Sequence, residues 1–420
     1  MVGRTAQRLS VHDFTTASPS DYSHLAHAND LEPSIGHAQL RATCPVHHET
    51  TSDSSFYVLS TFHDVVGTLK QPEVWRSGDG PGLFFQQGGV LGAADNPDHA
   101  RQRTVLRDAF LPTVINKLEP QVEAIALSLL DDLVPKGRGD FVGDFAFPFP
   151  ALVIGDLLGV LADDREDFRE WSVAIVNALG GGDLGAYQNA TDNVWRYIDE
   201  RVAEREALLT PGEIPDESAL GTVLPNDVVS RMLIGHLNGH LSRTEIQRLG
   251  HQLLVAGHET TTGLLGLMMY RFAQHPHIWK QLQENPELCE VAIEEALRFD
   301  SPVQGLFRTN THDVEIGGVH IPAGSKTQVL FASANRDESV WETPDEFRLD
   351  RNLHTLKKHV AFGWGVHHCI GAPLARLETR VALRLLLQRI GNLRVTKEPE
   401  NSETFILRGF GSLQMEWDVL

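Results

Sequence analysis

The longest run of helical periodicity in the chain lies between Ser242 and His275. Ser242 and Glu245 form a capping box at its start, with serine at the N-cap and glutamate three residues on. About 32 residues at a rise of 1.5 Å predict a helix of roughly 48 Å, long enough to cross a whole domain. Its centre, residues 256–262, reads Ala-Gly-His-Glu-Thr-Thr-Thr and departs from every preference of a buried helix. Such a departure in mid-helix indicates a functional segment.

Shorter segments with the same period predict a helical scaffold around this element. They cover residues 62–70, 117–134, 151–161, 164–179, 189–209 and 290–299. Gly180–Gly182 is interpreted as a flexible joint between two of these helices. Residues 209–225 are rich in Pro, Gly and acidic residues and predict a long surface loop, whose order and motion the sequence leaves open.

Short β-branched runs divided by Gly and Pro predict a small strand component. One strand is expected at 56–60, and hairpins at 303–308, 314–324 and 326–331. Residues 1–50 are polar and His-rich and form a poorly defined N-terminal segment. The pattern therefore predicts a mainly α fold with a small β component, in one domain over residues 51–420.

Composition narrows the class of protein. The 420 residues are 41% hydrophobic, and no repeat or linker-like tract divides them. Lys and Arg number 36 against 56 Asp and Glu, which gives a net charge of −20 and argues against nucleic acid or an anionic membrane as partner. With no apolar stretch of about 18 residues, no signal peptide and only three scattered cysteines, we expect a soluble, cytoplasmic protein, and a monomer.

One of those cysteines, Cys369, lies among the three glycines of residues 362–371, directly before a predicted helix with Pro373 in its first turn. The positive end of a helix lowers the pKa of a thiol, and the thiolate is the form that binds metals. The glycines would let the backbone approach a flat ligand closely. A buried structural cysteine is the alternative; a zinc site of His367, His368 and Cys369 is disfavoured because adjacent residues cannot converge on one tetrahedral ion.

This stretch resembles the haem-binding loop of the cytochrome P-450 haem-thiolate monooxygenases, whose pattern is Phe, any two residues, Gly, any, His or Arg, any, Cys, any, Gly. Phe362, Gly365, His367 and Cys369 match its fixed positions, as does Gly371. The resemblance implies that Cys369 is the axial iron ligand, that His367 binds a haem propionate and that Phe362 packs beside the thiolate.

Further propionate ligands are implied by the same family. His99 and Arg103 are four residues apart on a predicted helix and could clamp one anionic group, although a solvated basic face is the alternative. They match the family's His-x-x-x-Arg, and Arg308 matches its propionate-binding arginine. All three are therefore expected to bind haem.

The centre of the long helix resembles the family's oxygen-activation motif, Ala-Gly-x-Glu/Asp-Thr. Ala256 and Gly257 are then expected to lie flat against the haem, and Glu259 and Thr260 to form the acid–alcohol pair that handles protons. A polar kink that faces water is the alternative. His258 occupies a variable position of the motif and is expected on the surface.

The resemblance also implies a substrate pocket and a structural network. The expected pocket residues are Phe84, Phe85, Gln252, Val255, Val303, Gln304, Leu306 and Phe410. The expected network behind the haem consists of Glu295, Arg298 and Arg351. Four basic residues expected on the cysteine side are candidates for a patch on which an acidic redox partner would dock: Arg101, Arg107, Lys357 and Lys358.

Together these matches imply the family's fold, with the haem between the long helix and the helix after Cys369. They imply a monooxygenase that inserts one atom of O₂ into a lipophilic small molecule by hydroxylation or epoxidation. The implied cofactor is haem b (heme b, iron protoporphyrin IX), with O₂ as co-substrate and NAD(P)H acting indirectly through a separate 2Fe-2S or similar ferredoxin and its reductase. A haem-thiolate peroxygenase, another non-monooxygenase haem enzyme, or a haem-based sensor remain alternatives.

Overall fold

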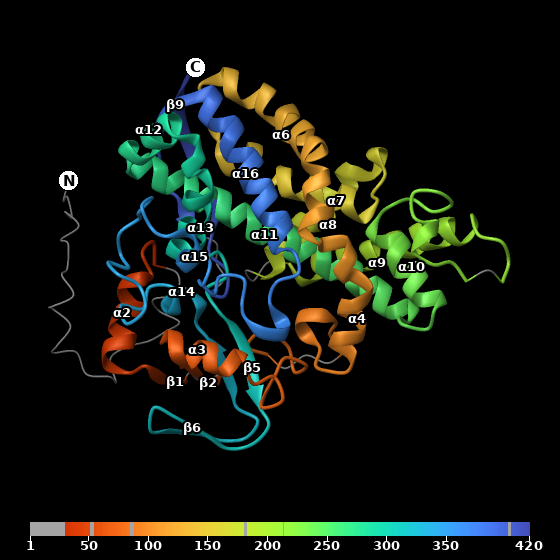
Figure 1. Cartoon of the computed structure of the whole chain (residues 1–420), viewed down its shortest axis with the longest axis horizontal. Coiled ribbons are helices and arrows are strands. Elements are labelled where there is room, and N and C mark those ends of the chain that lie inside the picture. Colours follow the sequence, from red (N-terminus) through yellow and green to blue (C-terminus); the bar gives the residue numbers. More distant parts are fainter. Residues whose placement is uncertain (1–29, 51–53, 85–87, 180–182, 213, 402–404) are drawn as a thin grey trace.

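A computed structural model describes residues 30–50, 54–84, 88–179, 183–212, 214–401 and 405–420 (Figure 1). Two sequence predictions, the joint at Gly180–Gly182 and the pocket residue Phe85, lie outside the described residues. Figure 1 follows the chain from α2 to the strands near its end.

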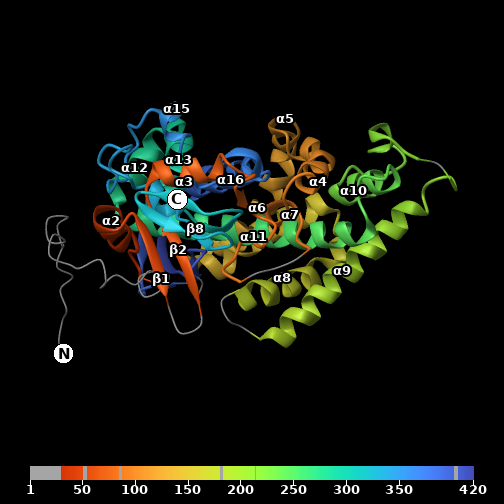
Figure 2. The ribbon, with the colours of Figure 1, turned by 90° about the horizontal axis from the view of Figure 1, so that it is seen from below.

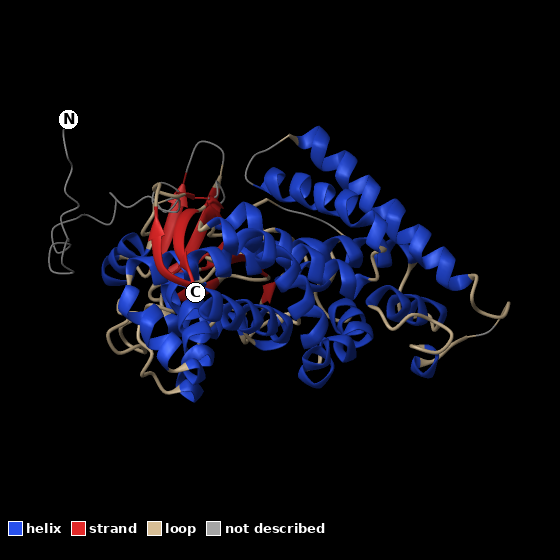
Figure 3. Cartoon of the chain, turned by 90° about the horizontal axis from the view of Figure 1, so that it is seen from above, coloured by secondary structure: helices blue, strands red, loops and turns tan. Residues whose placement is uncertain are grey.

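Helices dominate the structure (Figure 3). The main ones besides α11 are α2 (Ser34–Thr43), α3 (Phe62–Leu69), α4 (Asp98–Arg107), α6 (Glu119–Leu133), α7 (Pro148–Leu158), α8 (Arg165–Leu179), α9 (Leu184–Glu206), α10 (Val228–Leu237), α12 (Pro276–Glu284), α13 (Cys289–Asp300) and α16 (Ala372–Arg389). Shorter helices are α5 (Pro112–Ile115), α14 (Phe331–Ala334) and α15 (Leu353–Leu356).

The long helix α11 spans Arg243–Gln274 and crosses the molecule, with α8 and α9 beside it (Figure 2). Its capping box is complete, since Ser242 Oγ accepts from the Glu245 amide and the Glu245 side chain accepts from the Ser242 amide. Every residue from Thr261 to Phe272 is buried, so α11 forms the spine of the core. The sequence prediction for this element is confirmed.

The strands gather mainly at one side of the helices (Figure 3). One sheet has the order β1-β2-β8-β5-β3, formed by β1 (Val46–Thr50), β2 (Ser55–Leu59), β8 (Lys326–Val329), β5 (Leu306–Asn310) and β3 (Trp75–Arg76). A second has the order β4-β12-β9, formed by β4 (Arg138–Asp140), β12 (Gln414–Val419) and β9 (Ile390–Val395). Two small pairs complete the set: β6 (Val314–Ile316) with β7 (Val319–Ile321), and β10 (Glu400–Asn401) with β11 (Phe410–Ser412).

The loop before α16 depends on glycine. Gly365 has a φ of 69°, and a Cβ there would lie 2.7 Å from the carbonyl oxygen of Leu69. An L side chain would therefore meet both backbone strain and a clash. The close approach places the cysteine loop against the end of α3.

The sequence patterns missed several elements. Helices α10 and α12 were not predicted, and the first 50 residues contribute α2 and β1. β1 was overlooked because His47, His48 and Glu49 make it polar, yet it pairs in antiparallel register with β2. Within the described residues, no helix combines the length and apolar character needed to cross a bilayer.

Candidate active site

A cavity opens between α11, α16 and the loop that carries Cys369. Cys369 lines this cavity; its surface is accessible there, although protein atoms surround the sulfur closely enough to desolvate it. The structure brings the following predicted residues to its walls: His99, Arg103, Gln252, Ala256, Gly257, Thr260, Val303, Leu306, Arg308, Phe362, His367 and Cys369. They come from four separate parts of the chain, residues 99–103, 252–260, 303–308 and 362–369, so the fold brings together residues that the motifs placed far apart.

Backbone hydrogen bonds hold the cysteine loop in place. The Cys369 amide donates to the carbonyl of Phe362 at 2.9 Å, and Arg103 donates to the carbonyl of His368 at 2.8 Å. Burial raises the pKa of the Cys369 thiol, an effect opposed in part by the amides of Gly371 and Ala372. The expectation that the helix start lowers this pKa below its ordinary value is therefore wrong for the protein alone, because desolvation outweighs those amides.

Four nitrogen-bearing side chains crowd one end of the cavity. The rings of His99 and His367 lie 4.2 Å apart, and Nδ1 of His367 is buried with no partner among the described residues. Burial lowers the pKa of His367 to about 3, and Arg308, His99 and Arg103 add to that effect. Arg308 is 4% exposed, and burial lowers its pKa to about 10; it donates to the carbonyl of Phe307.

This arrangement fits a flat ligand that carries carboxylates. Crowded cationic and imidazole donors raise each other's cost of charging unless an anion lies among them. His367, whose Nδ1 has no partner among the described residues, lines the same cavity as Cys369, so one bound group could contact both residues. The donor set thus fits the haem that the sequence motifs imply.

Opposite the cysteine, the centre of α11 forms a second wall. Thr260 Oγ1 donates to the carbonyl of Ala256 at 2.9 Å, the back-bond expected of a mid-helix threonine. A Cβ on Gly257 would lie 3.0 Å from Ile154 of α7, which also lines the cavity, so a larger residue at this position would force Ile154 to shift. Glu259 does not line the cavity, and burial raises its pKa to about 7.

The prediction that His258 lies on the surface is wrong. Its side chain is 0% exposed, and both ring nitrogens have partners: Nδ1 lies 2.6 Å from Ser172 Oγ and Nε2 lies 3.0 Å from the carbonyl of Phe147. Burial lowers its pKa to about 4, so the ring is neutral near pH 7. Because α7 and α8 cover that face of α11, a position that looks variable in a motif is part of the core.

Some predicted pocket residues lie away from the cavity in the described structure. Phe84 is 77% exposed, and Phe410 is buried edge-on against Tyr270. The Gln304 amide nitrogen donates to two backbone carbonyls, those of Asp300 and Ser301, which ties it to the end of α13. Val255 is half-buried on a neighbouring face of α11. These four residues are corrected to positions outside the cavity walls.

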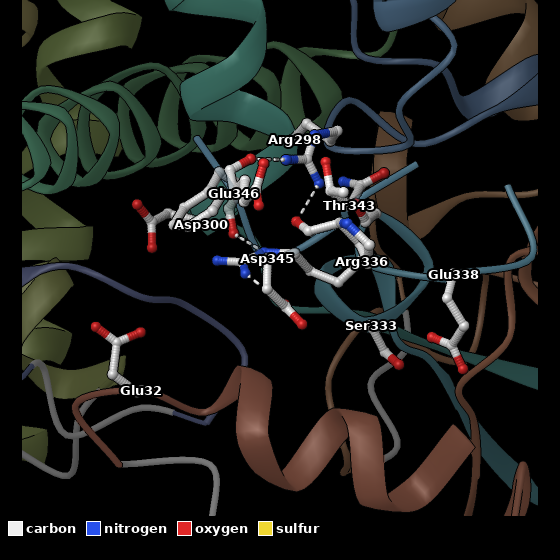
Figure 4. A network of polar contacts seen from close by, with 12 residues as sticks. Glu32, Arg298, Asp300, Ser333, Arg336, Glu338, Thr343, Asp345 and Glu346 are labelled. Atoms are coloured by element: carbon white, nitrogen blue, oxygen red, sulfur yellow. Dashed lines mark hydrogen bonds and ion pairs between the residues drawn. The ribbon is translucent and has the colours of Figure 1, made fainter. Parts of the chain in front are cut away.

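The predicted network lies behind the cysteine loop. Glu295 accepts from both Arg298 and Arg351 at 2.8 and 2.9 Å, and the Glu295 and Arg298 side chains are 0% exposed. Arg298 also donates to the carbonyls of Asn335 and Pro344. A third such bond goes to the carbonyl of Glu346, which is labelled with Arg298 in Figure 4. One guanidinium thereby joins α13 to the segment that leads to the cysteine loop.

Two further groups near the cysteine were missed. Glu378 is fully buried on α16, lines the cavity, and has a pKa that burial raises well above its ordinary value. The signal was its position in an apolar stripe, four residues after Leu374 and three before Val381. Arg376 binds Glu294 through two hydrogen bonds, and its guanidinium lies 4.5 Å from the ring centre of Phe362.

Known proteins resemble this chain in both sequence and fold. The Cytochrome P450 family model matches residues 172–415. The chain is 35% identical to erythromycin C-12 hydroxylase of Saccharopolyspora erythraea, covering 76% of this chain and 77% of that protein. It is 32% identical to the cyclomarin C epoxidase CymV of Salinispora arenicola, covering 86% and 89%.

A solved structure, that of cytochrome P450 CYP109Q5 from Chondromyces apiculatus, superposes with a TM-score of 0.82 at 31% identity. The superposition covers 94% of this chain and 98% of that one, so the two share the fold over nearly their whole length. Sequence, fold and the cysteine-lined cavity agree, and the chain belongs to the cytochrome P450 family, as a monooxygenase.

Proposed function

We propose that this chain binds haem b through Cys369 and oxidises a lipophilic small molecule, by hydroxylation or epoxidation, with electrons from a separate ferredoxin and its reductase. The observation that carries the proposal is the single cavity in which Cys369, the four nitrogen-bearing side chains and the α11 segment meet. When bound, the haem-thiolate supplies the activation of O₂. The remaining roles belong to residues of this chain.

Cys369 would ligate the iron, and His99, Arg103, Arg308 and His367 would bind the propionates. Binding to a metal cation would offset the effect of burial on the pKa of the Cys369 thiol, because a thiol that coordinates a metal is deprotonated. Propionate carboxylates would likewise offset the crowding of the four donors. The haem would therefore supply the positive charge that the thiolate needs and the negative charges that the four donors need, which supports its fit to this cavity.

Glu259 and Thr260 would move protons. A carboxyl with a pKa of about 7 can both donate and accept a proton near neutral pH, which suits it to a relay from solvent. Thr260 Oγ1 donates to Ala256, so its lone pairs remain available to accept from a water molecule in the cavity. We assign Glu259 the proton exchange with solvent and Thr260 the placement of the proton inside the cavity.

The substrate side of the cavity is apolar. Leu91, Leu253, Leu264, Val303 and Leu306 line it, and Gln252 contributes an amide group. Such a lining favours a molecule that is mostly hydrocarbon with one or two hydrogen-bonding groups. A compound library screened for molecules that shift the absorption spectrum of the haem-loaded protein would identify the substrate class.

The test of the proposed function is the variant Cys369→Ser. A hydroxyl stays protonated where a thiol ionises, so the reduced carbon-monoxide spectrum should lose its thiolate-type band even if haem is retained. The control is Cys289→Ser, since Cys289 is buried on α13 and does not line the cavity. An unchanged band in Cys369→Ser would exclude Cys369 as the ligand. Consumption of NADH with substrate, by the reconstituted chain, separates an oxygenase from a haem sensor.

A further inference from the structure

Two histidines of the long helix α11 contact α8 and α9, the two helices that cover it. The oxygen-activation motif does not explain either histidine. His251 and His258 are seven residues apart, two turns of α11, and therefore lie on the same face of the helix. His258 reaches Ser172 of α8, and His251 lies 3.4 Å from Thr191 Oγ1 of α9. Each covering helix thus presents one hydroxyl to one imidazole of α11.

The hydrogen bonds of His258 fix its tautomer. The carbonyl of Phe147 can only accept, so Nε2 carries the hydrogen and donates to it at 3.0 Å. Nδ1 is then the acceptor, and Ser172 Oγ donates to it at 2.6 Å. The ring is neutral, fully bonded and 0% exposed, and it also packs edge-on against the Phe147 ring at 4.1 Å between centroids.

These contacts link three elements at one point. Phe147 precedes α7, Ser172 lies in the middle of α8, and His258 lies between Gly257, which lines the cavity, and Glu259. Ser172 is also 0% exposed, so the link is inside the protein and shielded from water. A shift of α8 along α11 would break the short bond to Ser172 or pull on the helix turn that carries Glu259 and Thr260.

We propose that His258 is a positioning residue that couples the placement of the α8–α9 cover to the placement of Glu259 and Thr260, with His251 as a second, weaker tie. When α8 is seated, the imidazole holds the turn around residues 257–260 in one register. When α8 is displaced, that restraint is lost and the proton-handling pair is no longer held. Proton delivery is thereby matched to a closed cover. The consequence for protons rests on the proposed function; the tie between the helices does not.

The first arm of the test measures structure in the haem-loaded protein without turnover. His258→Phe keeps the ring packing but removes both hydrogen bonds of the imidazole. Only the bond from Ser172 ties α8, so amide hydrogen exchange in α8 should rise roughly tenfold, the size expected for one lost buried hydrogen bond. Ser172→Ala should give a similar rise, and the double variant little more than either. His258→Gln offers a donor and an acceptor on one planar group and should restore slow exchange. His320→Phe, on an exposed hairpin, is the control.

The second arm measures hydrogen peroxide and product per NADH in the same proteins. His258→Phe and Ser172→Ala should divert a larger share of NADH to peroxide, whereas His258→Gln should not. Unchanged exchange in α8 of folded His258→Phe would overturn the tie, and faster exchange with unchanged coupling would overturn the link to protons. A failure of the proposed function itself would be visible separately, as a Thr260→Ala variant that leaves coupling unaltered and a Glu259→Gln variant that leaves the turnover rate unaltered.

Discussion

Two glutamates on opposite sides of the cavity show how differently the two walls are built. Glu294, behind the cysteine, is buried; burial by itself would raise its pKa, but hydrogen bonds from His359 and Arg376 lower it to about 2. Glu259, in α11, is half-buried, and there burial raises the pKa to about 7. One carboxylate is permanently charged and holds structure in place; the other titrates in the neutral range.

The difference extends to the neighbours. On the cysteine side, Glu295, Arg298 and Arg351 form a closed set of buried ion pairs that holds α13 to the loop before Cys369. On the α11 side, the polar groups are threonine hydroxyls bonded back to their own helix and a histidine bonded to the cover. Paired charges resist movement, whereas neutral groups around one titratable carboxyl, that of Glu259, leave a group that can exchange protons.

The largest effect should come from breaking the paired wall. Arg298→Met leaves Glu295 buried beside a single arginine and should lower the free energy of unfolding by about 3–5 kcal/mol, with loss of haem from the purified protein. Arg348→Met is the control, because Arg348 pairs with Asp350 at the surface and its loss should change little. Urea unfolding and haem content measure both. A loss below about 1 kcal/mol in Arg298→Met would show that the network is not what holds this side.

The α11 wall should respond in the opposite direction. Because the folded pKa of Glu259 lies above its ordinary value of 4.5, the folded state favours the protonated acid, and its stability is lost as pH rises from about 4.5 to 7. Glutamine does not titrate, so Glu259→Gln lacks this loss. The free energy of unfolding of Glu259→Gln, relative to that of the unsubstituted protein, should therefore rise by up to about 3 kcal/mol between pH 4.5 and pH 8. The same variant should slow the whole catalytic cycle and flatten its dependence on pH near 7.

Thermal and urea unfolding at several pH values test the stability half of that prediction, and turnover across the same range tests the other. Glu245 provides the contrast, since hydrogen bonds from Arg101, Ser242 and Gln102 lower its pKa to about 2 despite burial. An equal stability difference at pH 4.5 and pH 8 between Glu259→Gln and the unsubstituted protein would mean that this carboxyl titrates at its ordinary pKa.

The smallest effect concerns the outer surface of the cysteine side. Arg101 is held by Glu245 and Asp98, and Lys357 by Glu290, so two of the four predicted docking residues already have partners. Among the described residues, Arg107 pairs with its sequence neighbour Asp108 alone, and Lys358 forms no ion pair. Arg107→Glu with Lys358→Glu should therefore slow electron transfer from the ferredoxin at low salt, with the difference vanishing at high salt. Rates that match the unsubstituted protein at every ionic strength would exclude the patch.

How well the sequence predicted each wall depends on whether the signal was local. Three motifs are each a single unbroken stretch of sequence: the capping box at Ser242, the Ala256–Thr260 motif and the Cys369 loop. Each could therefore be recognised without the fold. His258 and Phe410 were misplaced because their surroundings come from distant segments: α8 covers the first, and Tyr270 of α11 packs against the second. Gln304 was misplaced for a local reason, since its amide bonds to the nearby carbonyls of Asp300 and Ser301. Periodicity identifies a helix face but not the element that packs against it. Glu378 was missed although its place in an apolar stripe of α16 was visible.

The most direct test of the contrast between the walls is Thr260→Ala, measured for NADH, product and peroxide together. Thr260 lies on the cavity wall and takes part in none of the ion pairs that hold the cysteine side. Its loss should leave haem binding, the thiolate spectrum, substrate binding and NADH consumption largely intact, while product per NADH falls and peroxide rises. A Thr260→Ala enzyme that remains fully coupled would contradict the account, because protons would then reach the cavity without the α11 pair.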